Sequence, residues 1–171
     1  GSDRLVLLHD LKDNQTDTLL LNHSRIKALA TCQDGESFYA LEETGSVFYW
    51  EKGKDHLEVV IELKIPVTLS ALAVSPDQKT IALGDQNGIL RVFRIDNYQL
   101  LYSSQAHQAR ISCLEFDSQG TLLASGSWDQ KVQLRETWDY NQLPITLEDH
   151  DDRIQSLAFN GNGSTLYVGT A

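Results

Sequence analysis

The chain has 171 residues, of which 41% are hydrophobic, and its 24 acidic and 14 basic side chains give a formal net charge of −10. This apolar content is ordinary for a folded protein, and the sequence holds no run of about eighteen apolar residues, the minimum for a membrane-spanning helix. An acidic surface disfavours nucleic acid, because phosphate binding needs clustered Lys and Arg, and it favours a basic protein or peptide partner.

Short apolar and β-branched runs, separated by Gly, Asp, Asn and Ser clusters, predict antiparallel strands joined by tight turns along the whole chain. In chain order the predicted strands are 5–9, 18–21, 25–30, 37–41, 47–50, 57–63, 69–74, 80–83, 89–93, 99–102, 111–116, 121–125, 131–135, 145–147, 154–159 and 166–168. Pro144 weakens the strand that follows it, which suits a sheet edge.

The same features recur about every 42 or 43 residues, and the matching positions are easiest to see at a leucine that follows a small residue: Leu29, Leu72, Leu114 and Leu157. An Arg-Ile pair, preceded by a His, opens three of the four units, at Arg25-Ile26, Arg110-Ile111 and Arg153-Ile154. A glycine recurs at Gly84, Gly126 and Gly169. This period, with several short strands in each unit, predicts the blades of a β-propeller, since one small sheet buries too little surface by itself.

At these positions the chain resembles WD40 repeat proteins. The family's Gly-His position reads Asn22-His23, Ala106-His107 and Asp149-His150, and its turn Asp reads Asp129. The closing Trp-Asp dipeptide is replaced in each repeat, by His9-Asp10, Trp50-Glu51, Phe93-Arg94 and Arg135-Glu136. The resemblance implies structural roles for His23, His107, His150 and Asp129, with His107 bonded to the Asp129 turn and His23 to the turn near Thr44. The family's His–Ser–Asp–Trp network is expected to be incomplete in every blade.

The predicted fold class is therefore all-β, a single WD40-type array over residues 1–171. It divides into an outer half blade at 3–22, whole four-stranded blades at 23–64, 65–105 and 106–148, and an inner half blade at 149–171. The two half blades are complementary, and joining them closes four blades within one chain or eight between two chains. Because WD40 blades suit about seven per ring, we expect a homodimer that closes an eight-bladed ring, with an open fragment as the alternative. The opening Gly-Ser and the lack of Met indicate a piece of a longer protein.

Catalysis, cofactors and metal sites are not expected. The strands that would line the propeller channel carry one carboxylate, Glu115, and one base, Lys27, without a nucleophile–base set. The histidines fall one to a blade and lack metal-ligand spacing, and the acidic run 148–152 lacks the pattern of a calcium loop. Cys32 and Cys113 occupy non-equivalent positions, so we expect no disulfide, and free thiols favour a reducing, cytoplasmic location.

The remaining candidate site is the loop face, where the loops entering each first strand meet the turns between second and third strands. In the resembled fold this face would hold Arg25, Glu42, Glu43, Asp85, Gln86, Gln108, Arg110, Trp128, Asp151 and Arg153. Trp128 stands on a polar turn, and Trp and Arg dominate binding hot spots. We hypothesise that a protein or peptide docks here, with Trp128, Arg110 and Arg153 as anchors and Arg25, Gln108 and Asp85 beside them. In the alternative reading, Trp128 packs on a neighbouring blade and each Arg pairs with nearby acids.

The resemblance implies a non-catalytic protein–protein interaction scaffold or sensor segment of a larger WD40 protein. One alternative is a purely architectural or oligomerisation module. The other, which the residues favour less, is an enzyme with its site in the channel.

Overall fold

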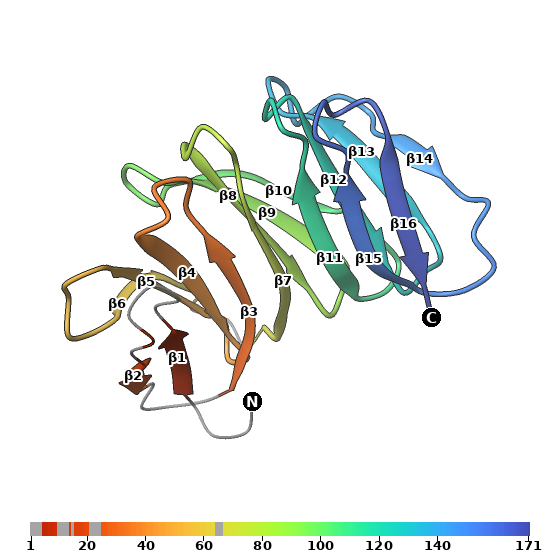
Figure 1. The fold of residues 1–171 in the computed structure, drawn as a ribbon. Coiled ribbons are helices and arrows are strands. Elements are labelled where there is room, and N and C mark those ends of the chain that lie inside the picture. Colours follow the sequence, from red (N-terminus) through yellow and green to blue (C-terminus); the bar gives the residue numbers. More distant parts are fainter. Residues whose placement is uncertain (1–4, 10–13, 15, 21–24, 64–66) are drawn as a thin grey trace.

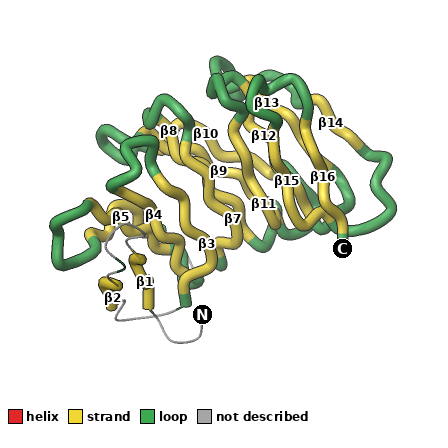
Figure 2. Tube along the Cα trace, in the orientation of Figure 1, coloured by secondary structure: helices red, strands yellow, loops and turns green. Residues whose placement is uncertain are grey.

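The computed structural model describes residues 5–9, 14, 16–20, 25–63 and 67–171, and every regular element among them is a β-strand (Figure 1, Figure 2). A two-stranded sheet pairs β1 (Leu5–His9) with β2 (Thr16–Leu20). The first four-stranded sheet contains β3 (Ile26–Thr31), β4 (Ser37–Glu42), β5 (Ser46–Glu51) and β6 (Glu58–Glu62). The second contains β7 (Leu69–Val74), β8 (Thr80–Asp85), β9 (Ile89–Arg94) and β10 (Leu100–Gln105). The third contains β11 (Ile111–Phe116), β12 (Leu122–Ser127), β13 (Val132–Glu136) and β14 (Ile145–Leu147). A final two-stranded sheet pairs β15 (Ile154–Phe159) with β16 (Leu166–Thr170).

The sheets stand side by side, with their first strands next to one another (Figure 1). β3 packs against β7, β7 against β11, and β11 against β15, while β6, β10 and β14 form the outer edges. All ladders are antiparallel and follow chain order within each sheet. The predicted fold class, with three four-stranded blades and two half blades, is confirmed.

The apolar core lies between the sheets rather than within any one of them. One cluster joins the first and second sheets through Leu41, Leu69 and Leu83. Another joins the second and third sheets through Leu90 and Ile111. A third cluster holds β1 on the first sheet through Val6, Phe38 and Phe48. Each sheet therefore depends on its neighbours for burial of its faces.

The recurring glycines make room for the next blade. A Cβ added at Gly84 would lie 2.5 Å from Cγ2 of Ile111, and one at Gly126 would lie 2.6 Å from Cγ2 of Ile154. Serine hydroxyls cross the same junctions, because Ser70 Oγ donates to the Ile111 carbonyl over 2.6 Å and Ser112 Oγ to the Ile154 carbonyl over 2.5 Å. The glycine that recurs in the sequence therefore corresponds to a contact that recurs between neighbouring blades.

The two half blades do not pair with each other in this structure. β1–β2 and β15–β16 are separate sheets, so the four-bladed ring within one chain is not formed. On β16, Tyr167 remains 62% exposed. The ring between two chains stays a prediction.

Candidate functional site

The loop face lies where the first strand of each sheet begins and the second strand ends, on the side of Figure 1 where the C-terminus is drawn. Backbone hydrogen bonds fix the loops to the turns in the same way in successive sheets. The Gln86 amide donates to the Thr68 carbonyl over 3.0 Å, and the Trp128 amide donates to the Arg110 carbonyl over 3.0 Å. The residue after each second strand is thereby held beside the residue before each first strand.

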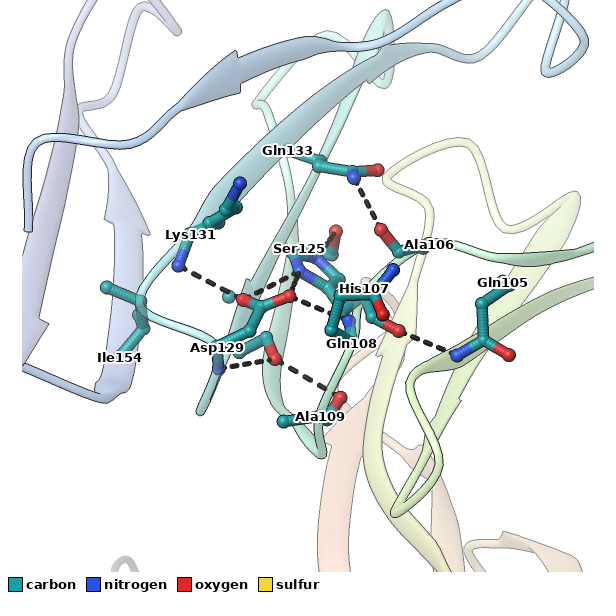
Figure 3. A network of polar contacts seen from close by, with 12 residues as sticks. Gln105, Ala106, His107, Gln108, Ala109, Ser125, Asp129, Lys131, Gln133 and Ile154 are labelled. Carbon is teal, nitrogen blue, oxygen red and sulfur yellow. Dashed lines mark hydrogen bonds and ion pairs between the residues drawn. The ribbon is translucent and has the colours of Figure 1, made fainter.

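His107 enters the third sheet with 1% of its surface exposed, and both of its ring nitrogens have partners (Figure 3). Nδ1 lies 3.1 Å from Oδ2 of Asp129, and Nε2 lies 2.8 Å from Oγ of Ser125. A carboxylate only accepts hydrogen bonds, so Nδ1 carries the proton and Nε2 accepts from the Ser125 hydroxyl. The structure thus brings together the His107 and Asp129 that the sequence paired.

Asp129 also fixes the turn around it. Its carboxylate accepts hydrogen bonds from two backbone N–H groups, that of Gln108 over 2.9 Å and that of Lys131 over 3.1 Å. Burial lowers the pKa of the His107 imidazole below its ordinary value, although the Asp129 charge acts in the opposite sense. Burial would raise the pKa of the Asp129 carboxyl, but the Gln108 amide, His107 and the Lys131 amide together hold that pKa below its usual range. At neutral pH the pair is therefore a neutral ring bonded to a carboxylate.

Arg135 stands where the family has its closing Trp, and sequence reasoning missed its packing role. Its guanidinium lies 5.4 Å from the centre of the Tyr102 ring of the preceding sheet, and Nη2 donates to Oε1 of Gln133 over 2.9 Å. The Arg135 side chain takes the place of an aromatic ring between two sheets. The network therefore contains His107, Ser125 and Asp129 but lacks the Trp that is its fourth member in the family.

The other two histidines differ from His107. His150 is half-buried, and its Nδ1 has no hydrogen-bond partner within the part of the chain that the structure describes. His23 lies outside the described residues, so its expected bond near Thr44 remains a prediction.

Trp128, Arg110 and Arg153 meet on the loop face, and we call these three residues the Arg–Trp–Arg site. The Cζ atoms of Arg110 and Arg153 lie 4.9 Å and 4.8 Å from the centre of the Trp128 ring. Trp128 remains 37% exposed. Arg110 belongs to the same sheet as Trp128, whereas Arg153 comes from the next sheet, so the site spans a blade junction.

This arrangement combines parts of both readings of Trp128. Through Arg153 the indole does pack on the neighbouring blade. The arginines, however, pair with the ring rather than with acids, because no carboxylate among the described residues lies within ion-pair distance of either guanidinium. Nε of Arg110 is buried and has no acceptor there.

The other predicted contact residues are dispersed. Asp85 departs from the expectation of a rim residue, because it is fully buried and accepts from Nη1 of Arg91 over 2.7 Å. The short polar turn after β8 folds over its carboxylate, which also accepts the amides of Asn87 and Ile89. Gln108 is exposed next to Arg110. Arg25 is exposed at the first sheet, two sheets away from Trp128.

The first strands of three sheets line a cavity of about 400 Å³ at the end of the array opposite the loop face. Glu115 is the carboxylate in its lining, and burial raises the pKa of that carboxyl. Lys27 is engaged elsewhere, since its ammonium lies 2.8 Å from Oε1 of Glu43. The two ionisable groups of the predicted channel are thus not brought together.

Cys32 and Cys113 are free thiols, and burial raises the pKa of each. The described ranges hold no group of three or more His, Cys, Asp and Glu side chains arranged for a metal ion. Within the same ranges, no helix is long and apolar enough to cross a membrane.

Residues 98–136 and 141–171 match the family described as WD domain, G-beta repeat. These two segments are WD40 repeats. The first matched segment contains the whole His107–Ser125–Asp129 network, and the second contains β15 and β16. WD40 proteins are in general non-catalytic protein–protein interaction scaffolds.

Several WD40 proteins are similar to this chain over part of its length. Periodic tryptophan protein 2 homolog of Schizosaccharomyces pombe is 32% identical over 103 residues, which cover 60% of this chain and 12% of that protein. WD repeat-containing protein 62 of Sus scrofa is 32% identical over 107 residues, or 61% of this chain and 7% of that protein. Mitogen-activated protein kinase-binding protein 1 of Homo sapiens is 31% identical over 96 residues, which cover 54% of this chain and 6% of that protein. The chain therefore spans only a small part of the relatives that it matches.

Proposed function

We propose that this chain is a non-catalytic protein-recognition segment that docks a peptide or protein on its loop face, with Trp128, Arg110 and Arg153 as anchors. The observation that carries this proposal is the position of two guanidinium groups, 4.9 Å and 4.8 Å from the centre of one partly exposed indole. Aromatic and Arg side chains provide most of the energy at protein interfaces, and a stacked guanidinium keeps its N–H edges free for a partner. Gln108 flanks these anchors, and Arg25 extends the same face.

The surroundings of the site support a partner with basic residues. The run 148–152 contains four acidic side chains and precedes Arg153 directly, and the whole chain has a net charge of −10. Such a surface attracts cationic segments at long range. The name of one relative states that it binds a mitogen-activated protein kinase, which agrees with a protein as the partner class.

The test compares two exposed tryptophans. Binding partners are isolated with the whole chain, and the affinity of each is then measured for the wild type, Trp128→Ala and Trp138→Ala. Trp138 is 70% exposed in the loop between β13 and β14, away from the loop face, and serves as the matched control. We expect Trp128→Ala to weaken binding by about tenfold or more and Trp138→Ala to leave it unchanged. Equal affinities for the wild type and Trp128→Ala would refute the proposed site.

A second candidate is an oligomerisation module. It is favoured by the two half blades, which remain separate two-stranded sheets in the chain. In that case β1–β2 of one copy joins β15–β16 of another, and residues 1–171 of each copy supply half of an eight-bladed ring. The free thiols of Cys32 and Cys113 support a reducing, cytoplasmic setting for either function.

A further inference from the structure

We propose that the Arg–Trp–Arg site recognises a carboxylate side chain, Asp or Glu, in the segment that docks on the loop face. This inference rests on the proposed function and specifies the chemistry of the docked group. Basic residues of the same segment would face the acidic run 148–152, so that an acidic residue flanked by basic ones is the expected pattern.

Nε of Arg110 is buried, so the parts left for an incoming acceptor are the Nη end of Arg110 and the guanidinium of the exposed Arg153. A guanidinium that lies over an aromatic ring uses its face, so the N–H groups at its edge point away from the ring. These edges match a carboxylate, which accepts two parallel hydrogen bonds. Stacking on Trp128 also restricts both side chains, so less conformational entropy is lost when a partner binds.

Several other cations among the described residues lie beside acids, although Arg25, Lys54 and Arg135 do not. Lys131 lies 2.6 Å from Glu148, Lys27 lies 2.8 Å from Glu43, and Arg91 lies 2.7 Å from Asp85. Within the described residues, neither Arg110 nor Arg153 has such a partner, although the whole chain is rich in acids. Both guanidinium groups lie within reach of one indole and carry the same charge, so an anion that binds either of them offsets part of their repulsion.

The nearby acids favour a carboxylate over a phosphate. Asp129 remains anionic beside Trp128, and Asp151 and Asp152 are exposed next to Arg153. These charges repel a dianion more strongly than a monoanion. Asp152 is directed to the backbone, where its Oδ1 accepts the Arg153 amide over 2.7 Å, and so it does not occupy the guanidinium edge.

The experiment selects binders from a library of random twelve-residue peptides displayed on phage, with the whole chain as the target. We expect the selected peptides to be enriched in Asp or Glu, and to bind Arg110→Gln/Arg153→Gln at least about tenfold more weakly than the wild type. Arg94→Gln is the matched control, because Arg94 is an exposed arginine on the second sheet. Thermal unfolding of each variant checks that the fold is kept.

The outcomes separate the two proposals. Peptides that require Trp128 but show no acidic enrichment would uphold docking on the loop face and overturn the carboxylate inference. For a selected peptide, replacing its Glu with Gln is expected to abolish the difference between the wild type and the double variant. Replacing the same Glu with phosphoserine is expected to weaken binding, and tighter binding would overturn the choice of a carboxylate. If no selected peptide depends on Trp128, the proposed function itself fails.

Discussion

The residues around His107 combine burial with a charge, which makes the third blade sensitive to acid. The His107 pKa is lowered in the fold from an ordinary value of 6.5, so the unfolded chain binds a proton more readily than the folded chain. This contribution to stability is complete above pH 6.5 and is lost as the pH falls toward the folded pKa. Asp129, whose pKa is also lowered, adds stability that is lost at still lower pH.

We therefore expect the melting temperature of the chain to fall between pH 7.5 and pH 5.5, and His107→Gln to make that fall shallower. Thermal unfolding followed by circular dichroism at a series of pH values measures both slopes. The same slope in the variant as in the wild type would show that His107 titrates as it does in the unfolded chain.

A second prediction at this scale concerns Gly84. Its Cβ position is occupied by Ile111, which is fully buried and β-branched and cannot move aside. Gly84→Ala is expected to destabilise the chain by about 1–3 kcal/mol through overpacking. Gly161→Ala is the control, because its added Cβ meets no atom within 4 Å, and its effect should stay within about 0.5 kcal/mol. Urea unfolding of both variants tests the difference, and equal stabilities would contradict the proposed contact.

Single residues also show where sequence reasoning stops. The pairing of His107 with Asp129 follows from the repeat, because both positions belong to one motif. The burial of Asp85 does not follow, since it depends on Arg91 from the next strand covering a polar turn. The contact of Arg153 with Trp128 depends on how two blades are placed, which local sequence does not encode.

Among the elements, three of the four first strands have the predicted bounds, and the remaining one, predicted at 25–30, is shifted by one residue. The predicted strands 69–74, 111–116 and 154–159 coincide with β7, β11 and β15, because turn residues bound each apolar run. The second strands are longer than predicted, since β8 continues to Asp85 and β12 to Ser127. Asp85 pairs with Leu69 and Ser127 pairs with Ile111, each at the start of a first strand. These strand ends are held by backbone pairing, so the hydrophobic pattern of the sequence does not reveal them.

The junction between two blades yields a prediction at the scale of elements. The hydroxyl of Ser70 is buried and donates to the Ile111 carbonyl of the next sheet. Ser70→Ala leaves that bond unmade, so we expect a loss of about 1 kcal/mol in the free energy of unfolding. Ser103→Ala, on the exposed part of β10, should cost less than about 0.5 kcal/mol. If urea denaturation gives equal values for the two variants, the serine does not join the blades.

For the whole molecule, the open end of the array has the form of a blade junction. Gly84 contacts Ile111 of the following sheet, and Gly126 contacts Ile154 of the sheet after that. Gly169 occupies the equivalent position in the last repeat. In the first complete sheet, Ile26 occupies the position of those isoleucines. If β1–β2 of a second copy completes the blade of β15–β16, Ile26 of that copy is expected to pack on Gly169.

This arrangement predicts a mass in solution of twice the 19.2 kDa of one chain, measured by sedimentation equilibrium over a range of concentrations. A valine at position 169 is expected to fill the space that Ile26 of a second copy would take, and its Cβ would also lie 2.4 Å from Oγ of Ser156 in its own sheet. Gly169→Val should therefore shift the mass to that of a single chain. Gly161→Val, in the exposed turn between β15 and β16, should keep the mass of two chains. Circular dichroism checks that both variants keep their strands. A wild type that sediments as one chain at every concentration would exclude the two-chain ring. The loop-face site would be unaffected by that result, because Arg110, Trp128 and Arg153 all come from one chain.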